Sequence, residues 1–376
     1  MISSQNGAER PRVAVVFGGR SSEHGVSCLT AGEVIAAIDH DRFDVVPIGI
    51  TTEGRWVLES SRPGRFAITA GGLPVVDPDG AAVALASDSG RELVVSEPGA
   101  VPHPLGEVDV VLPLLHGPWG EDGTIQGLFE LAGVRYVGAG VLASAVGMDK
   151  HFMKLVFAAA GLAQMPHILV RAQQWQVDRP AVRERVAALG YPVFVKPARA
   201  GSSFGISRVE DPEALDAAVE VAHQYDPKVL VEAAALGARE LECGVLQGRD
   251  GAPPEASVVG EIELDNSSGH TFYDFVAKYV DGGGVARVPA DVPGAVAQDV
   301  RRQAIVAFEA LGCEGLARVD FFWMPGGQVL VNEINTMPGF TPTSMFPALW
   351  AASGLDYPAL VDRLLCLALD RSTGLR

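Results

Sequence analysis

The chain has 376 residues, of which 48% are hydrophobic, and a formal net charge of −17 at pH 7. That length and apolar content suffice for two or three folded domains and exclude a disordered protein. The negative charge, which no basic cluster offsets, argues against nucleic acid or an anionic membrane as the main partner. No segment resembles a signal peptide or a membrane span, so we expect a cytoplasmic protein.

The first part of the chain alternates strands and helices. Residues 12–17 form a β-branched run that stops at a glycine pair, and residues 26–38 have apolar positions at helical spacing. Residues 60–107 are rich in Gly, Pro, Asp and Ser, which predicts small edge strands and turns. The alternation predicts a mostly parallel, helix-covered sheet. Its further elements are predicted as strands at 43–50, 108–115 and 134–137 and a helix at 124–131.

A second region begins with a predicted helix at residue 149 and has the pattern of a smaller αβ domain. From about residue 233 onward, further strands precede a long helix and a hairpin. The elements predicted here are strands at 191–196, 206–209, 240–246 and 257–264 and helices at 212–224 and 293–312.

The four cysteines lie far apart and form no CxxC pair. No histidines stand near them at zinc-site spacing, so we interpret them as buried thiols rather than as a disulfide framework or a metal site. They are Cys28, Cys243, Cys313 and Cys366.

The stretch GLARVDFFWMPGGQVLVNEIN predicts a polar hairpin. Two apolar runs flank the turn sequence MPGG, and strand periodicity places Arg318 and Asp320 on one face, as it does Glu333 and Asn335. A turn centred between Pro325 and Gly326 places Arg318 opposite Glu333. Two carboxylates and an amide oxygen suit Mg²⁺, whereas the alternative is a solvated strand face with an ordinary ion pair.

The stretch VFVKPARAGSSFGISRV predicts a phosphate-binding loop. A lysine ends a strand, and the glycines and serines after it can offer backbone N–H groups and hydroxyls to phosphate oxygens. No Walker motif occurs, which excludes a P-loop ATPase. Taken alone, a loop of this composition is more often a simple hairpin turn than a phosphate site. Lys150 begins a helix and is either a second phosphate ligand or a solvated lysine.

The segment GAGVLA at 138–143 formally fits a dinucleotide-binding fingerprint. It lacks the acidic residue expected about twenty positions later, and it does not open the first βαβ unit. We therefore reject an NAD site.

Together these motifs resemble the D-alanine:D-alanine ligases of the ATP-grasp superfamily over nearly the whole chain. The matching motifs occur in the family's order: GGRSSEHGVS (18–27), HGPWGEDG (116–123), MDK (148–150), KPARAGSSFG (196–205), FYDFVAKY (272–279), GLARVD (315–320) and NEINTMPGFT (332–341).

The resemblance implies an α/β fold of three domains, with an N-terminal parallel-sheet domain and two αβ domains that sandwich ATP. We place an N-terminal substrate-binding domain at 1–148, a central ATP-grasp subdomain at 149–232 and a C-terminal catalytic domain at 233–376. The family's members are usually dimers, so the resemblance implies a homodimer, which the composition by itself does not indicate.

The resemblance also assigns site residues. For two Mg²⁺ ions, for which Mn²⁺ can substitute, it implies Asp320, Glu333 and Asn335 as ligands. For ATP it implies Lys150, Lys196, Ser203, Glu232, Ala233 and Glu240, the last less firmly because that segment is one residue longer than in some relatives. For the amino acids it implies Glu23, His116, Gly339 and Ser344.

The activity implied is ATP-dependent ligation of two D-alanines through a D-alanyl phosphate, for peptidoglycan precursor synthesis. Arg318 with the Gly339 N–H resembles the family's oxyanion hole, Lys278 a ligand of the transferred phosphate, and Glu23, Ser202 and Tyr279 a proton-handling trio. Local alternatives are that Glu23 caps the following helix and that Tyr279 packs on the core. The competing functions are a D-alanine:D-serine or D-alanine:D-lactate ligase, or a non-catalytic ATP-binding protein of the same fold.

Overall fold

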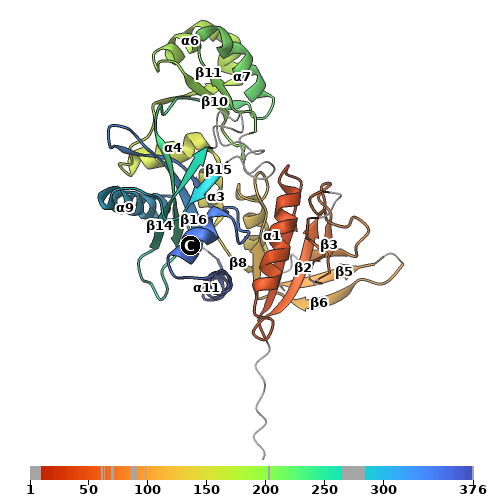
Figure 1. The fold of residues 1–376 in the computed structure, drawn as a ribbon. Helices are drawn as coiled ribbons and strands as arrows, with labels where there is room; N and C mark the ends of the chain where they lie inside the picture. The colour runs from red at the N-terminus through yellow and green to blue at the C-terminus, as the bar shows by residue number, and fades with distance from the viewer. Residues whose placement is uncertain are drawn as a thin grey trace, which may run out of the picture. The chain divides into compact units, whose positions relative to one another are not determined.

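The computed structural model describes residues 10–374 apart from 61, 63, 69–71, 86–90, 98, 202–203 and 265–283. The chain forms two compact units, which are described separately (Figure 1). The first comprises Met1–Leu115, Ile125–Val137 and Asp356–Arg376, and the second comprises His116–Thr124 and Gly138–Leu355.

In its described residues, the first unit has one eight-stranded sheet of order β6-β5-β4-β3-β2-β1-β7-β8. The strands β2, β1, β7 and β8 are parallel, and β3 to β6 extend the sheet by antiparallel pairing. The parallel part is as predicted, but the antiparallel half makes the sheet mixed rather than mostly parallel. The strands are β1 (Arg12–Gly18), β2 (Asp44–Ile50), β3 (Trp56–Leu58), β4 (Ala82–Leu85), β5 (Glu92–Ser96), β6 (His103–Glu107), β7 (Val110–Pro113) and β8 (Arg135–Tyr136).

Strand β1 is buried at every position after Arg12. A central parallel strand is covered on both faces, which explains its continuous run of apolar residues. Helix α1 (His24–Ala37) packs on β1, and α11 (Tyr357–Leu369) packs on α1, β7 and β8. Helix α2 (Thr124–Leu131) adds Ile125 and Phe129 to this core.

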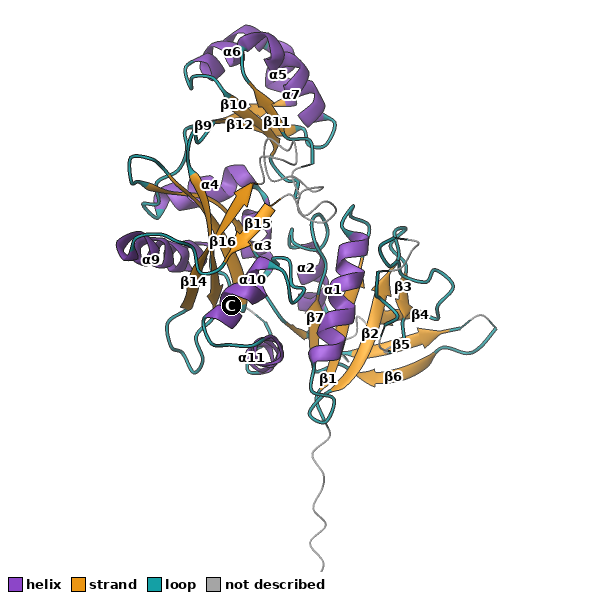
Figure 2. Ribbon diagram, in the orientation of Figure 1, coloured by secondary structure: helices purple, strands orange, loops and turns teal. Residues whose placement is uncertain are grey.

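The second unit contains a four-stranded antiparallel sheet of order β11-β10-β12-β9. Figure 2 shows helices α5 to α7 on this sheet, and their apolar faces form one core with it. The elements are β9 (His167–Arg171), α5 (Ala172–Val177), α6 (Arg179–Ala187), β10 (Val193–Pro197), β11 (Ser207–Val209), the 3-10 helix η1 (Pro212–Ala214), α7 (Leu215–His223) and β12 (Lys228–Ala233).

The same unit contains a five-stranded sheet of order β15-β14-β13-β16-β17 within the described residues. Helix α9 packs along its strands, and α3 and α4 pack against α9 and β17 (Figure 1). The elements are α3 (Val141–Met148), α4 (Lys150–Ala159), β13 (Arg239–Leu246), β14 (Glu255–Leu264), β15 (Gly284–Arg287), α9 (Gly294–Leu311), β16 (Leu316–Trp323), β17 (Val329–Asn335) and α10 (Met345–Ala352).

The cysteines are free thiols, as predicted. Cys28, Cys243 and Cys313 are buried, and burial raises the pKa of each thiol to about 12. Cys366 is only half-buried, which corrects the expectation that all would be core residues.

Candidate active site

The hairpin β16–β17 carries the predicted metal ligands. Its ladder places Arg318 opposite Asn335 and Asp320 opposite Glu333. The prediction that Arg318 lies opposite Glu333 is therefore wrong by two residues.

Two local features cause this shift. The Met324 N–H donates to the Gln328 carbonyl at 2.8 Å, so the turn centres on Gly326. The ladder is also irregular just after Asp320, where β17 contains one extra residue, Asn332. Such an extra residue is a β-bulge, which bends a strand and re-aims the side chains beyond it.

The bulge decides which side chains share a face. A regular ladder continued from the turn would place Asn332 opposite Asp320 and turn Glu333 to the other face, because neighbouring residues in a strand alternate. With the bulge, Glu333 lies opposite Asp320, and Asn335 Nδ2 donates to Asp320 Oδ2 at 3.0 Å. The predicted common polar face is therefore present, although through a different register.

Arg318 is held between two carboxylates. Its Nε and Nη2 donate to the two oxygens of Asp320, both at 2.7 Å, and its Nε lies 2.9 Å from Glu242 Oε2. Burial lowers the pKa of Arg318, but Asp320 and Glu242 outweigh it and raise the pKa well above its usual value. The guanidinium is thus a fixed positive charge in a nearly dry environment, with its side chain only 14% exposed.

The donor chemistry of this face fits a magnesium ion. Asp320, Glu333 and Asn335 supply two carboxylates and an amide, which are hard oxygen ligands. Among the described residues, no group of three His, Cys, Asp or Glu side chains has the arrangement of a complete metal site. Mg²⁺ takes water and phosphate oxygens as well as protein oxygens, so these three side chains could hold it.

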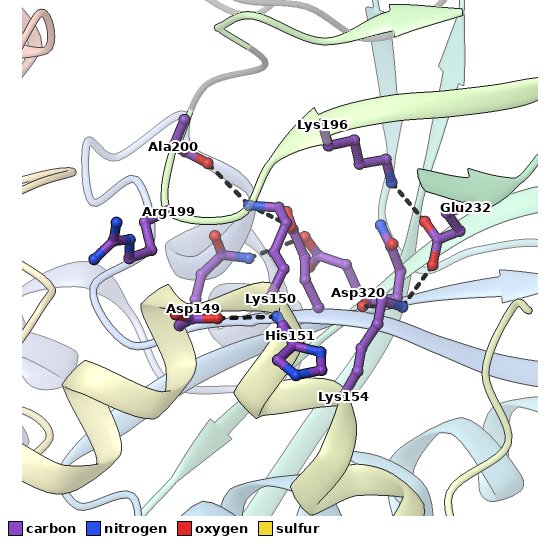
Figure 3. Close-up of polar contacts among 12 residues, drawn as sticks. Asp149, Lys150, His151, Lys154, Lys196, Arg199, Ala200, Glu232 and Asp320 are labelled. Carbon is purple, nitrogen blue, oxygen red and sulfur yellow. Dashed lines mark hydrogen bonds and ion pairs between the residues drawn. The ribbon is translucent and has the colours of Figure 1, made fainter. Parts of the chain in front are cut away.

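Two lysines share one buried carboxylate at the edge of this face. Lys196 Nζ donates to Glu232 Oε2 at 2.7 Å, and Lys154 Nζ lies 2.6 Å from Glu232 Oε1 (Figure 3). Burial raises the pKa of Glu232, but the two ammonium groups outweigh it and hold the pKa at about 2. Glu232 is thus a carboxylate at every physiological pH.

Lys150 connects the predicted phosphate-binding loop to the hairpin. Asp149 caps helix α4, accepting from His151 N at 3.1 Å, so Lys150 is the first residue of the helix. Lys150 Nζ donates to the Ala200 carbonyl at 2.9 Å (Figure 3). The same Nζ lies 3.6 Å from Glu333 Oε2. The two phosphate lysines implied by the resemblance therefore both lie beside carboxylates of this unit.

The loop after β10 requires glycine at its far end. Gly205 has φ of +70°, a conformation that side chains other than glycine adopt at a cost. A Cβ there would lie 2.6 Å from Tyr225 Cδ2 and 2.9 Å from Pro197 Cγ. The positive φ angle and the lack of room for a Cβ atom thus both favour glycine at position 205.

The predicted nucleotide residues beyond Glu232 lie on strands of two different sheets. Ala233 ends β12, and its N–H is engaged with the Pro166 carbonyl at 2.9 Å. Glu240 lies on β13 opposite Phe322 of β16. Strand alternation places Glu240 on the same face as Glu242.

The predicted substrate residues of the second unit lie in two loops. His116 Nδ1 lies 3.2 Å from the Met337 carbonyl, and Glu121 Oε1 accepts from Met337 N at 3.2 Å. The HGPWGEDG loop is thus bound to the segment that contains Gly339. Ser344 precedes α10, and its Oγ accepts from Thr341 N at 3.1 Å.

Glu23 lies in the first unit, directly before α1. It is buried, but its side chain makes no capping hydrogen bond to the helix, so the capping alternative is wrong. Its neighbour His24 bonds Gly19 O at 2.7 Å through Nδ1 and accepts from Val76 N at 3.2 Å through Nε2. Those contacts fix the glycine turn after β1.

Some predicted site residues lie outside the described part of the chain. Of the proton-handling trio, the described residues include only Glu23. The predicted site residues outside the described ranges are Ser202, Ser203, Lys278 and Tyr279.

Comparison with known protein families shows to which family the chain belongs. Residues 12–139 match the family model described as D-ala D-ala ligase N-terminus, and residues 156–366 match the one described as D-ala D-ala ligase C-terminus. The chain belongs to the D-alanine:D-alanine ligase family. The recognition made from its motifs is confirmed.

Relatives in this ligase family match nearly end to end. A protein of Paenarthrobacter aurescens (strain TC1) named D-alanine-D-alanine ligase is 58% identical over 98% of this chain and 97% of its own length. One of the same name from Kineococcus radiotolerans is 59% identical over 98% of this chain and 99% of its own length.

Solved ligase structures share the fold. VanG D-Ala:D-Ser ligase from Enterococcus faecalis has a TM-score of 0.81 and 34% identity, covering 96% of this chain and all of that one. The D-alanine-D-alanine ligase from Coxiella burnetii has a TM-score of 0.80 and 33% identity, covering 97% and 95%. The predicted α/β ATP-grasp ligase fold is therefore confirmed.

Sequence reasoning missed two charged residues that contact the predicted site residues, Glu242 beside Arg318 and Lys154 beside Glu232. Glu242 lies two positions after Glu240 on the same strand, so period-two alternation could have identified it. Lys154 lies four positions after Lys150, which is one helical turn, so helical periodicity could have identified it.

Proposed function

We propose that this enzyme joins two D-alanines to D-alanyl-D-alanine through a D-alanyl phosphate, converting ATP to ADP and phosphate, for peptidoglycan precursor synthesis. Members of the family use ATP. The observation that carries the proposal is the convergence of Lys150 with Glu333, and of Lys196 with Glu232, around a hairpin face that holds Arg318 and Asp320. A protein that only bound nucleotide would not need a buried guanidinium on that face.

The first step is attack by a carboxylate oxygen of the first D-alanine on the γ-phosphorus of ATP, with ADP as leaving group. Lys150 and Lys196, with Ser203 of the glycine loop, bind and orient the phosphates, so the protein mainly positions the groups and neutralises charge. Two Mg²⁺ ions, for which Mn²⁺ can substitute, would be held by Asp320, Glu333 and Asn335 and would neutralise negative charge on the phosphates.

The nucleotide base and ribose are assigned to the strand ends beside Lys196. Glu232 and the backbone at Ala233 bind the base, and Glu240 binds the ribose. The Ala233 N–H already donates to Pro166 O, so the base contacts backbone groups of that segment other than this N–H.

The second step is attack by the amine of the second D-alanine on the acyl carbon, which expels phosphate and releases one proton. Arg318 and the Gly339 N–H stabilise the oxyanion. Glu23 and His116 bind the first D-alanine, and Ser344 the carboxylate of the second. Lys278 holds the transferred phosphate, and Ser202 and Tyr279 with Glu23 take the proton.

The proposed domains are a substrate-binding domain at 1–148, a central subdomain at 149–232 and a catalytic domain at 233–376. We propose that the enzyme acts on small molecules in the cytoplasm, as a homodimer. Within the described ranges, no helix has the length and hydropathy of a membrane span.

The test is ADP release by purified protein with ATP and Mg²⁺, with the product identified by mass. D-Alanine alone should give ADP and a dipeptide of the expected mass, and L-alanine should give neither. ATP binding without ADP release for any amino acid would refute the proposal.

The likeness to the D-Ala:D-Ser ligase makes D-serine the acceptor to compare first. Competition between D-alanine and D-serine, and between D-alanine and D-lactate, measures acceptor preference. We expect D-alanine to dominate, because the more similar relatives carry the D-alanine-D-alanine ligase name.

A further inference from the structure

Two lysine ammonium groups contact the Glu232 carboxylate, although one positive charge is enough to neutralise it. Lys154 and Lys196 approach different oxygens of it, at 2.6 and 2.7 Å, from helix α4 and strand β10 (Figure 3). The Glu232 side chain is 2% exposed, so it requires a cation to remain charged in this environment. One ammonium neutralises it, and the second gives the cluster a net positive charge.

The two lysines differ in how they are held. The Lys154 side chain is 2% exposed, and its Nζ also donates to the Asn332 carbonyl at 3.4 Å. Gln164 Nε2 donates to the Lys154 backbone carbonyl at 2.9 Å. Lys154 is therefore enclosed by α4, β12 and the bulge of β17.

Lys196 is in a different position. It is the second-last residue of β10, directly before the glycine loop, and its side chain is 12% exposed. Apart from Glu232, its ammonium faces the Phe194 ring, 5.7 Å from the centroid. A lysine at a strand end can swing toward a ligand, whereas one enclosed on a helix cannot.

We propose that Lys154 is a positioning residue: it is the permanent counter-charge of Glu232 and thereby lets Lys196 leave Glu232 for the phosphates of a nucleotide. Without Lys154, the departure of Lys196 would leave the buried Glu232 carboxylate with no counter-charge. Lys196 would therefore stay paired with Glu232, and phosphate binding would weaken. The low pKa of Glu232 agrees with this, because the group stays charged throughout. The inference rests on the proposed ATP binding.

The experiment uses the full chain and two competitive inhibitors of its ATP-dependent ADP release. Magnesium tripolyphosphate probes the phosphate end, and adenosine probes the base end. In Lys154→Met we expect the Ki of tripolyphosphate to rise about tenfold, while that of adenosine changes less than about threefold. Equal loss of both, or no change in either, would overturn the proposal.

The control variant is Arg302→Met, which removes one positive charge from the exposed face of α9, where the Arg302 side chain is 64% exposed. It should leave both inhibition constants unchanged. If the tripolyphosphate Ki rose as much in the control as in Lys154→Met, the effect would come from the protein's overall charge. That result would also overturn the proposal.

A second pair of variants remains informative if Lys154→Met does not fold. Glu232→Gln removes the buried charge, and Lys154→Met/Glu232→Gln removes both charges. Once residue 232 is neutral, Lys154 has no carboxylate to hold, so the single and double variants should bind tripolyphosphate equally. Weaker binding by the double variant would mean that Lys154 contacts phosphate itself or is needed only for folding.

Failure of this inference is distinct from failure of the proposed function. If wild-type protein forms the dipeptide and tripolyphosphate inhibits it, the function stands whatever Lys154→Met does. If wild-type protein releases no ADP with D-alanine, the function and the role of Lys154 fall together.

Discussion

Asp320 lies opposite Glu333 across the β16–β17 ladder, immediately beside the extra residue Asn332. That pairing depends on the bulge, because a regular ladder would turn Glu333 away from Asp320. The bulge carbonyl in turn accepts from Lys154 Nζ at 3.4 Å. The hairpin that carries the proposed metal ligands is therefore connected to the lysines around Glu232.

Replacing Glu333 with Gln should remove most activity. The amide keeps the shape of the side chain but removes the charge that pairs with Lys150 and would bind Mg²⁺. We expect kcat to fall about 100-fold or more, with a raised Mg²⁺ requirement. The measurement is ADP release over a Mg²⁺ titration. Glu309→Gln, on the exposed face of α9, is the control, and equal activity of the two variants would refute the assignment.

Replacing Arg318 with Lys should impair chemistry more than ATP binding. Lysine cannot reproduce the paired contacts to Asp320 together with the contact to Glu242. We expect kcat to fall about 100-fold while KM for ATP changes little. Steady-state kinetics measures both, with Arg302→Lys as control. A rise in KM for ATP with unchanged kcat would place Arg318 in nucleotide binding instead.

Stability should depend on Glu232 in acid. Its pKa is lowered from 4.5 to about 2, so its stabilisation is complete above pH 4.5 and is lost as the pH falls toward 2. The difference corresponds to about 3 kcal/mol in the free energy of unfolding. Denaturant unfolding from pH 6 to pH 2 should therefore show a shallower decline in Glu232→Gln than in wild type. Parallel curves would contradict the assigned pKa.

Replacing Gly205 with Ala should weaken ATP binding beyond the effect of backbone strain. Gly161 is a matched control, because it has φ of +76° and an added methyl group there would meet no atom within 4 Å, whereas one at Gly205 would meet Tyr225 and Pro197. Gly161→Ala should lower stability by about 1 kcal/mol, and Gly205→Ala by more. Only Gly205→Ala should raise KM for ATP. Thermal unfolding and kinetics test both, and equal effects would exclude a role for the loop packing.

The sequence by itself determined the order of the elements and the residue types of the site. Glycine pairs, apolar periodicity and turn residues marked β1, α1, α9 and the hairpin, because those signals are local. Period-two alternation also grouped Arg318 with Asp320 and Glu333 with Asn335. Motif order then identified the family. The roles of the individual site residues stay predictions, and Ser202, Ser203, Lys278 and Tyr279 also lie outside the described part of the chain.

Only the tertiary structure decided how those residues meet. The register of the hairpin depends on a turn centred on Gly326 and on a bulge, and neither leaves a distinctive local pattern in the sequence. The contacts of Glu242 with Arg318 and of Lys154 with Glu232 join residues 76 and 78 positions apart. Such pairs form because strand pairing and helix packing bring buried charges together, and no local rule specifies which cation a buried carboxylate receives.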